Sequence, residues 1–544
     1  MSLDPQPISP IPTLTRHIAQ QAFPKGNVYM NMRDTLGTFY TDDVFHDLYP
    51  RDGQSAYAPW RLALISIMQF AENLTDRQAA DAVRARIDWK YALSLELSDT
   101  GFDYSVLSEF RQRLVTHEAG ERLLDTMLDG LREADLLKVS QQRSDATHVL
   151  AAVQRLNRLE LVGRSLQYAL DAVSEAAPDW LREWVEPIWF TRYGAPLSDY
   201  RLPKSKDERA ALAHQIGLDG WHLLEAIYED ATTPAHLREL PAVDILRQIW
   251  LQQYVWLDEQ LKWREGKDLP PAQRLIQSPF DLEARYSRKR QTEWVGYKTH
   301  LTETCVADTP NLITHVLTTP ASTPDVVALP DIHAGLAQND TLPDDHFVDA
   351  GYMSAVDLVQ AETDYAVNLM GFVRTDSSWQ TATGYDISAF TIDWDKQQVT
   401  CPQGQPSTSW NPQSDAKRTL IRVAFPKSVC QACPARTQCT RSTRRHLCFP
   451  EQAVFEKREE RREEQQEKAF QKRYQIRSGI EGSMSQGAFV LGMRRSRYRG
   501  LDKTHLQHVL TATAMNLTRA MNWMARPEKS KTRRSRFVRL QDAA

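Results

Sequence analysis

The chain of 544 residues lacks the features of a membrane or secreted protein. Its first twelve residues hold one acid, four prolines and no apolar run, so they do not predict a secretory signal. No stretch approaches the roughly 18 consecutive apolar residues that a transmembrane helix needs. We therefore expect a cytoplasmic protein with no membrane partner. In that reducing compartment its six cysteines are more suited to metal binding than to disulfides.

An excess of positive charge is also missing, because the net charge is −4. This value excludes a uniformly basic protein that coats DNA, while 42% hydrophobic and 25% charged residues are typical of a globular protein. The average conceals a basic C-terminal block, which has thirteen Lys or Arg and two acids between positions 494 and 539. Such a block commonly neutralises phosphates, and a solubilising tail is the alternative from position 526 onward.

The N-terminal part predicts short amphipathic helices. Apolar residues recur at helical spacing in 62–69 and 106–114, and Thr75 can cap a helix over 76–86. Five arginines on these helices could contact DNA if they are exposed: Arg77, Arg84, Arg86, Arg111 and Arg113. A helical scaffold or a dimerisation domain would have the same pattern. A second helical region, rich in Leu, Ala and Trp, precedes position 277 and carries no recognisable chemistry.

From position 285 the hydrophobic period changes from helical to alternating. The pattern predicts strands over 294–301, 312–317, 346–352 and 365–373, with helices over 325–336 and from 355 onward. With a further strand over 137–150, these elements predict an α/β core with a mixed sheet. Apolar residues between 506 and 524 predict a closing amphipathic helix.

Two aspartates are predicted to end strands of this core, Asp145 and Asp349. Ligands gather at the carboxyl ends of strands in open α/β sheets, so the two acids can converge there. If the segment with Glu481 packs against the sheet, three carboxylates can hold two divalent cations. Two such cations, held close together, support in-line phosphoryl transfer.

Around Glu481, an aromatic ring and a guanidinium share one stripe of a helix with the carboxylate, because Tyr474, Arg477 and Glu481 are spaced three and four residues apart. In this combination the carboxylate can bind a divalent cation, while the ring and the guanidinium contact a nucleic-acid backbone beside it. A solvated helix face is the alternative, since a dense mixed-charge run precedes it. Glycines at 479 and 482 also weaken a helix there.

Five of the six cysteines lie between positions 401 and 448. Cys430, Cys433 and Cys439, with Cys401 about thirty residues upstream, could supply four thiolates to a structural Zn²⁺. Cys448 is a possible substitute ligand, and reduced cysteines without metal are the alternative.

In combination these motifs resemble the DDE transposases of bacterial insertion sequences, in the cut-and-paste branch of the RNase H-like (retroviral-integrase) superfamily. Three segments carry the resemblance: Ser144-Asp145-Ala146-Thr147, Val348-Asp349-Ala350-Gly351-Tyr352 and Tyr474-x-x-Arg477-x-x-x-Glu481. The helical stretch from Tyr49 to Leu114 also resembles a domain common in these elements. One departure is Ala488, where the family signature usually has a lysine.

The resemblance implies an RNase H-like core that is divided by insertions. The expected parts are a DNA-binding helical domain (1–137), the first core strand (138–150), a helical insertion (151–280), the continued core (281–378), a cysteine-rich insertion (379–450), the C-terminal helices of the core (451–525) and a basic tail (526–544).

The resemblance also implies a chemistry. Asp145, Asp349 and Glu481 would bind Mg²⁺ or Mn²⁺, water would cut DNA at the terminal inverted repeats, and the freed 3′-hydroxyl would attack target DNA. Tyr474 and Arg477 would hold the backbone near the cut, and Arg494 or Arg495 could replace the missing lysine as DNA contacts. The expected partner is double-stranded DNA at the nucleoid, bound by a homodimer or a larger synaptic complex.

Two other functions remain open from the sequence. A transposase-derived DNA-binding protein without catalysis would need no intact acidic triad, and a nuclease of the same fold would cut without joining strands.

Overall fold

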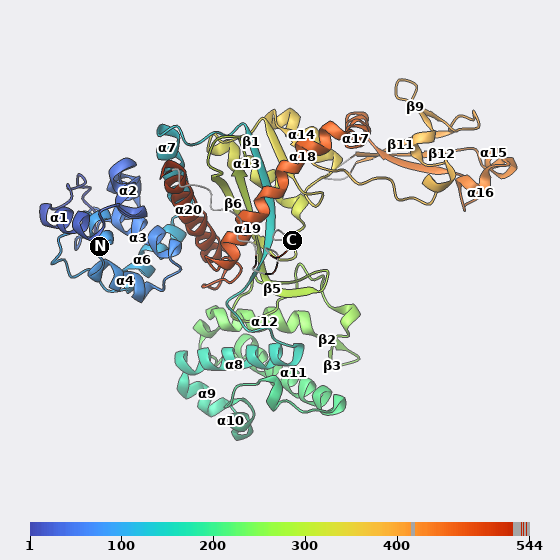
Figure 1. The fold of residues 1–544 in the computed structure, drawn as a ribbon. Coiled ribbons are helices and arrows are strands. Elements are labelled where there is room, and N and C mark those ends of the chain that lie inside the picture. Colours follow the sequence, from blue (N-terminus) through green and yellow to red (C-terminus); the bar gives the residue numbers. More distant parts are fainter. Residues whose placement is uncertain (415–418, 526–534, 536, 538–539, 541–544) are drawn as a thin grey trace.

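The computed structural model describes residues 1–414, 419–525, 535, 537 and 540, and its centre is a mixed β-sheet (Figure 1). The predicted basic tail, 526–544, lies outside these residues apart from positions 535, 537 and 540. The strands of the sheet are β1 (Gln141–Leu150), β4 (Arg285–Lys289), β5 (Thr292–Thr304), β6 (Ile313–Pro320), β7 (Asp345–Val348) and β8 (Asn368–Met370). The predicted α/β core with a mixed sheet is confirmed.

Strand pairing gives the order β6-β5-β1-β7-β8, with β4 on the first residues of β5. β1, β5 and β6 are antiparallel neighbours, whereas β7 and β8 run parallel to β1. The strand predicted over 365–373 is shorter than expected, because only Asn368–Met370 pairs with β7.

Helices cover both faces of the sheet. α13 (Asp325–Gln338) and α14 (Ala355–Tyr365), which begin where the sequence predicts, pack on one face with Val348 and Leu369 in their core. The other face meets the closing helix α20 (Leu501–Ala525) and α19 (Ile480–Phe489), whose Ile480 and Met484 join the largest apolar cluster. Because side chains alternate along a strand, the acid at 145 lies on this second face together with Arg143.

The N-terminal helices share that largest cluster with α20. They are α1 (Thr13–Ala22), α2 (Val28–Thr35), η1 (Asp42–Leu48), α3 (Pro59–Ala71), α4 (Asp76–Ala85), α5 (Ile87–Ala92), α6 (Ser105–Thr116) and α7 (Arg122–Glu133). Thr75 caps α4 in a reciprocal pair with Gln78, as the sequence indicates. The buried face of α3 meets α20 in one continuous apolar core, so this segment is attached to the sheet rather than separate from it.

The prediction of five exposed arginines on these helices is wrong in part. Arg77 and Arg84 are exposed, but Arg86 and Arg113 are half-buried and Arg111 is only 6% exposed. Arg111 donates to Asp76 at 2.6 Å, and Arg86 pairs with Asp88 at 2.6 Å. These two guanidiniums lie among carboxylates where the helices pack. The two exposed arginines also have partners, since Arg84 pairs with Asp81 at 3.0 Å and Arg77 donates to the Tyr104 hydroxyl at 3.1 Å.

A second helical body lies below the sheet in Figure 1 and has its own apolar cluster. Its elements are α8 (Arg158–Ala176), α9 (Pro178–Trp184), α10 (Pro187–Tyr193), η2 (Asp199–Arg201), α11 (Lys206–Glu229), η3 (Ala235–Glu239), α12 (Pro241–Gln253), β2 (Tyr254–Leu257), β3 (Gln260–Trp263) and η4 (Gly266–Asp268). The chain enters this body from the end of β1 and leaves it to form β4, so the body is an insertion in the sequence between two strands of the sheet.

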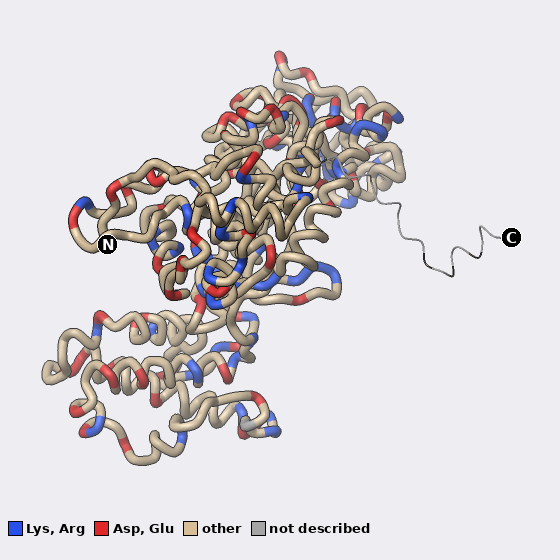
Figure 2. Tube along the Cα trace, turned by 60° about the vertical axis from the view of Figure 1, so that its left-hand side comes forward, with Lys and Arg blue, Asp and Glu red and all other residues tan. Residues whose placement is uncertain are grey.

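A third body extends to the opposite side of the sheet from the N-terminal helices (Figure 1). It contains η5 (Thr381–Thr383), η6 (Ile387–Ala389), β9 (Thr391–Asp393), β10 (Gln398–Thr400), β11 (Ser409–Ser414), β12 (Thr419–Ala424), α15 (Lys427–Ala432), α16 (Arg436–Cys439) and β13 (His446–Pro450). The chain returns through α17 (Gln452–Glu464), α18 (Lys468–Tyr474) and η7 (Gln475–Gly479) to α19. Basic and acidic residues are interspersed over all three bodies (Figure 2).

Among the helices of the described segments, none is both long enough and apolar enough for a bilayer crossing.

Several histidines are buried beside the sheet in neutral form. His333 and His346 contact each other at 2.9 Å, and the other ring nitrogen of His346 contacts Ser144 at 2.7 Å. Burial lowers the pKa of His300, His315 and His333 to about 4, and that of His508 to about 3. Because an unfolded histidine titrates near pH 6.5, protons bind the unfolded chain first as the pH falls.

We therefore expect stability that is fully present above about pH 6.5 and lost as the pH falls toward 4. The loss is about 1 kcal/mol per pH unit for each histidine that stays neutral in the fold. Thermal unfolding midpoints at pH 7.5, 6.5 and 5.5 measure it. His508→Gln should reduce the slope, with His46→Gln at an exposed position as control. A midpoint that does not change with pH would contradict the expectation.

Candidate active site

The pairing of β1 with β7 brings two of the predicted acids together. The parallel register runs from Gln141 opposite Asp345 to Ser144 opposite Val348. The next residues along the two segments are Asp145 and Asp349. Parallel partners point to the same face, and the two carboxylates are therefore neighbours on the face that meets α19.

The prediction that Asp145 ends its strand is wrong. β1 continues for five further residues to Leu150, because its other edge pairs with β5 as far as Gly296. Only the pairing with β7 stops at Ser144. Asp349 does follow the last residue of β7.

The environment of the two aspartates differs from that of Glu481. Asp145 accepts a hydrogen bond from the Ala146 N–H at 2.7 Å, and Asp349 accepts one from the Ala350 N–H at 2.8 Å. Burial raises the pKa of Asp145 and the charge of Asp349 raises it further, whereas the Ala146 N–H and Arg477 lower it. The side chain of Glu481 is 68% exposed, against 21% for Asp145.

Arg477 connects the acids of the sheet with the acid of the helix. Its Nη1 lies 3.3 Å from Asp145 Oδ2 and its Nη2 lies 3.5 Å from Glu481 Oε1. Burial works against this charge, but Asp145, Tyr474 and Asp349 raise the pKa of Arg477 above its usual value. The arginine is thus held between carboxylates, and all four charged groups line one pocket.

Tyr474 lies beneath the pocket rather than in it. Its hydroxyl donates to the carbonyl of Val348 at 2.9 Å, directly before Asp349. Its ring packs against Phe372 at 4.7 Å between centroids and stacks on Phe470. Burial raises the pKa of this phenol to about 12. The expected single helical stripe is interrupted, because residues 475–479 form the 3-10 turn η7 between two α-helices.

A buried ion pair fixes η7 and α19 on the sheet. Arg143 Nη2 lies 2.7 Å from Glu303 Oε1, with side chains that are 6% and 0% exposed. Arg143 also donates to the Ile476 carbonyl at 2.6 Å, while Glu303 accepts from Ser483 of α19 and, at 2.8 Å, from Arg519 of α20. One carboxylate therefore joins β1, β5, α19 and α20, which sets the position of Glu481.

Basic residues surround the pocket, which has a volume of about 790 Å³. A basic turn between β4 and β5 contributes the last two residues of β4, Arg288 and Lys289, and the turn residue Arg290, all of them exposed. This turn is not among the site residues predicted from the sequence, although its run of three basic residues is visible there. A fourth carboxylate, Asp325, also lines the pocket but pairs with Lys298 at 2.8 Å.

The two arginines proposed to replace the missing lysine lie in different places. Residues 494–496 run beside the end of β1, where the Leu150 N–H donates to the Arg494 carbonyl at 2.8 Å. The side chain of Arg494 lines the pocket and donates to Thr147 at 2.8 Å. Arg495 is exposed and is not among the residues that line the pocket.

The acids have the donor chemistry that a hard divalent cation prefers, since all their ligand atoms are oxygens. Within the described residues, no three His, Cys, Asp or Glu side chains already lie at metal-binding spacing. The guanidinium of Arg477 lies between Asp145 and Glu481.

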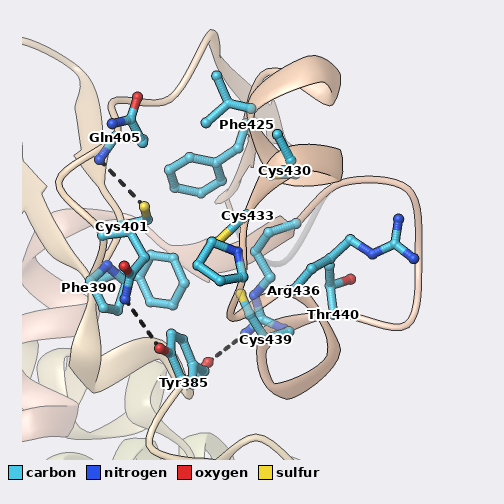
Figure 3. A pocket seen from close by; sticks show the side chains of 16 residues that line it. Tyr385, Phe390, Cys401, Gln405, Phe425, Cys430, Cys433, Arg436, Cys439 and Thr440 are labelled. Atoms are coloured by element: carbon cyan, nitrogen blue, oxygen red, sulfur yellow. Dashed lines mark hydrogen bonds between the residues drawn. The ribbon is translucent and has the colours of Figure 1, made fainter.

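The predicted zinc ligands line a different pocket from the three acids. Cys401, Cys430, Cys433 and Cys439 surround it (Figure 3). Cys448 is exposed on β13 and is not among the lining residues.

Two family models match the chain. A model described as "Transposase DDE domain" matches residues 400–521, and one described as "Transposase domain (DUF772)" matches residues 17–113. The first segment contains Arg477 and Glu481, whereas Asp145 and Asp349 lie outside both. No curated protein and no solved structure matches the chain.

The close approach of Arg143 to η7 gives a test of how α19 is held. A Cβ on Gly479 would lie 2.1 Å from Arg143 Nη1, whereas a Cβ on Gly482 would meet nothing within 4 Å. Gly479→Ala should therefore displace the guanidinium from Glu303 and lower the unfolding free energy by about 1–3 kcal/mol relative to Gly482→Ala. Both changes replace a glycine of helical backbone by alanine, so their difference reports chiefly the contacts of Arg143 with Glu303 and with the Ile476 carbonyl.

Thermal unfolding of the two variants, with hydrogen exchange of the α19 amides, measures this difference. Equal midpoints and equal exchange would show that Arg143 does not fix the helix.

Proposed function

We propose that this chain, a member of the DDE transposases of insertion sequences, binds the terminal inverted repeats of its element, cuts DNA there and joins the 3′-hydroxyl ends to target DNA. The proposal rests on one observation above all. Asp145 and Asp349 follow the same register pair of two parallel strands, and Arg477 contacts both Asp145 and Glu481 in a pocket with a basic rim.

In this proposal Asp145, Asp349 and Glu481 hold divalent cations, for which Mg²⁺ or Mn²⁺ suits an all-oxygen donor set. When bound, such ions activate an attacking oxygen and stabilise the leaving oxygen of a phosphodiester. The mixed sheet that carries the two aspartates supports an RNase H-like core.

The protein residues around the acids have separate roles in this proposal. Arg288, Lys289 and Arg494 neutralise the phosphates of the bound strand and so fix its register. Arg477 balances the carboxylates in the free protein and can turn to a phosphate when cations replace its charge. Tyr474 is a positioning residue, since its hydroxyl holds the carbonyl next to Asp349.

A single assay separates the proposal from its alternatives. Purified protein is incubated with Mg²⁺ and a DNA fragment that carries the inverted ends flanking its gene, and cleaved and joined products are scored. Joined products support a transposase, and cutting without joining supports a nuclease. Binding without cleavage supports a DNA-binding protein that has lost catalysis.

Removing one carboxylate should abolish the chemistry but not the binding. We expect Glu481→Gln, Asp145→Asn and Asp349→Asn each to lower the cleavage rate more than about 100-fold, because even outer-layer ligands change metal-site activity by about 10- to 100-fold. DNA affinity should change only a few-fold. Asp344→Asn is the matched control, since this exposed acid precedes β7 at the opposite end of the strand. Cleavage by Glu481→Gln at the wild-type rate would exclude the assigned triad.

The basic turn between β4 and β5 should contribute charge rather than sequence recognition. The double variant Arg288→Ala with Lys289→Ala is expected to weaken binding to all DNA sequences, and to reduce the slope of log K against log salt by about 1–2. Fluorescence anisotropy between low and moderate salt measures the slope. Lys262→Ala with Lys267→Ala, at exposed positions of the helical insertion, is the control. An unchanged slope in the turn variant would remove this turn from the DNA contact surface.

A further inference from the structure

The third body of the chain has a small core of its own. Seven buried apolar residues form it, with the rings of Trp394 and Trp410 packed around Phe449 at 5.5–5.7 Å between centroids. The body lies away from the central sheet in Figure 1, joined to it by the chain that enters η5 and by α17. A core of this size supplies limited stability, and small units of this kind commonly carry a metal or a disulfide.

Four cysteines from three separate elements converge beside this core. Cys401 follows β10, Cys430 lies in α15, Cys433 ends that helix, and Cys439 ends α16. All four line one pocket of about 300 Å³ (Figure 3). The spacing of Cys430 and Cys433 is visible in the sequence, but the approach of Cys401 and Cys439 to the same pocket is a result of the fold.

The surroundings of Cys401 suit a negatively charged sulfur. The Gln405 N–H donates to Cys401 Sγ at 3.4 Å, and the Gly404 N–H donates to the Cys401 carbonyl at 2.8 Å. Gly404 has φ of +74°, a conformation that other residues rarely adopt, so this tight turn depends on glycine. A backbone N–H that points at sulfur stabilises a thiolate, which is the form that binds metal.

A guanidinium on the pocket wall supplies compensating charge. Arg445 lines the pocket and donates to the Cys439 carbonyl at 3.0 Å and to the Tyr385 carbonyl at 3.4 Å. Its buried Nε has no hydrogen-bond partner among the described residues. Four thiolates around one divalent cation leave a net charge of −2, which an adjacent arginine partly offsets.

We propose that Cys401, Cys430, Cys433 and Cys439 bind one structural Zn²⁺ that joins the turn after β10 to α15 and α16. Zinc binds four thiolates in a tetrahedral arrangement at about 2.3 Å. The four cysteines line one pocket, but among the described residues they are not at metal-binding spacing, so binding of the ion would require their sulfurs to move closer together. Cys448 is excluded as a ligand because it lies on β13 outside the pocket.

Metal analysis of the full-length protein, purified under reducing conditions from zinc-supplemented cells, tests the proposal. We expect about one zinc per chain for the wild type, and a loss of most of it in Cys401→Ser and Cys433→Ser. Cys448→Ser should retain the full amount, and so should Asp349→Asn, because its carboxylate belongs to the other pocket. Zinc that is absent from the wild type, or lost in Cys448→Ser, would overturn the assignment.

Cobalt titration covers the case in which the serine variants fail to fold. Wild-type protein stripped of metal should develop the absorption of tetrahedral Co²⁺ bound by thiolates, and added Zn²⁺ should remove it. Thiol counting on the stripped protein identifies the competing arrangement. Disulfides among the four cysteines, with no cobalt spectrum after reduction, would contradict the zinc site. These readouts do not depend on DNA cleavage, so they fail or succeed separately from the proposed function.

Discussion

The ion pair between Arg143 and Glu303 is the interaction on which the arrangement of the site depends. Glu303 is fully buried and is satisfied by two arginines and a serine from three other elements. A buried charge that loses a partner is costly, so this network tolerates few alternative arrangements. It sets α19 against the sheet, and through α19 it sets the distance of Glu481 from the two aspartates.

The pocket combines opposite charges in a way that suits a polyanionic substrate. The carboxylates of Asp145, Asp349 and Glu481 line it together with exposed basic residues of the β4–β5 turn. A uniformly basic cleft would bind DNA without holding cations, and a uniformly acidic one would repel phosphates. Arg477 lies between Asp145 and Glu481 and partly neutralises their charge.

The three bodies around the sheet differ in how they are attached. The N-terminal helices share a continuous core with α20 and with Ile480 and Met484 of α19, so these elements pack as one unit. The helical insertion and the cysteine-containing body have separate clusters. Long insertions are tolerated at the ends of strands because closing a longer loop costs little additional entropy.

The sequence by itself determined what local patterns encode. Thr75 as a helix cap, the starts of α13 and α14, and the α/β core with a mixed sheet were all readable from spacing and hydrophobic period. The grouping of Asp145, Asp349 and Glu481 was implied by the family resemblance. Tertiary structure alone decided the pairs that are distant in sequence. Asp145 neighbours Asp349 through strand register, Arg143 meets Glu303 across 160 positions, and Cys401 reaches Cys439 through a turn. Hydrophobic periodicity indicates which face of a helix or strand is buried. It does not indicate which segment packs on that face, because this depends on contacts between segments that are distant in sequence.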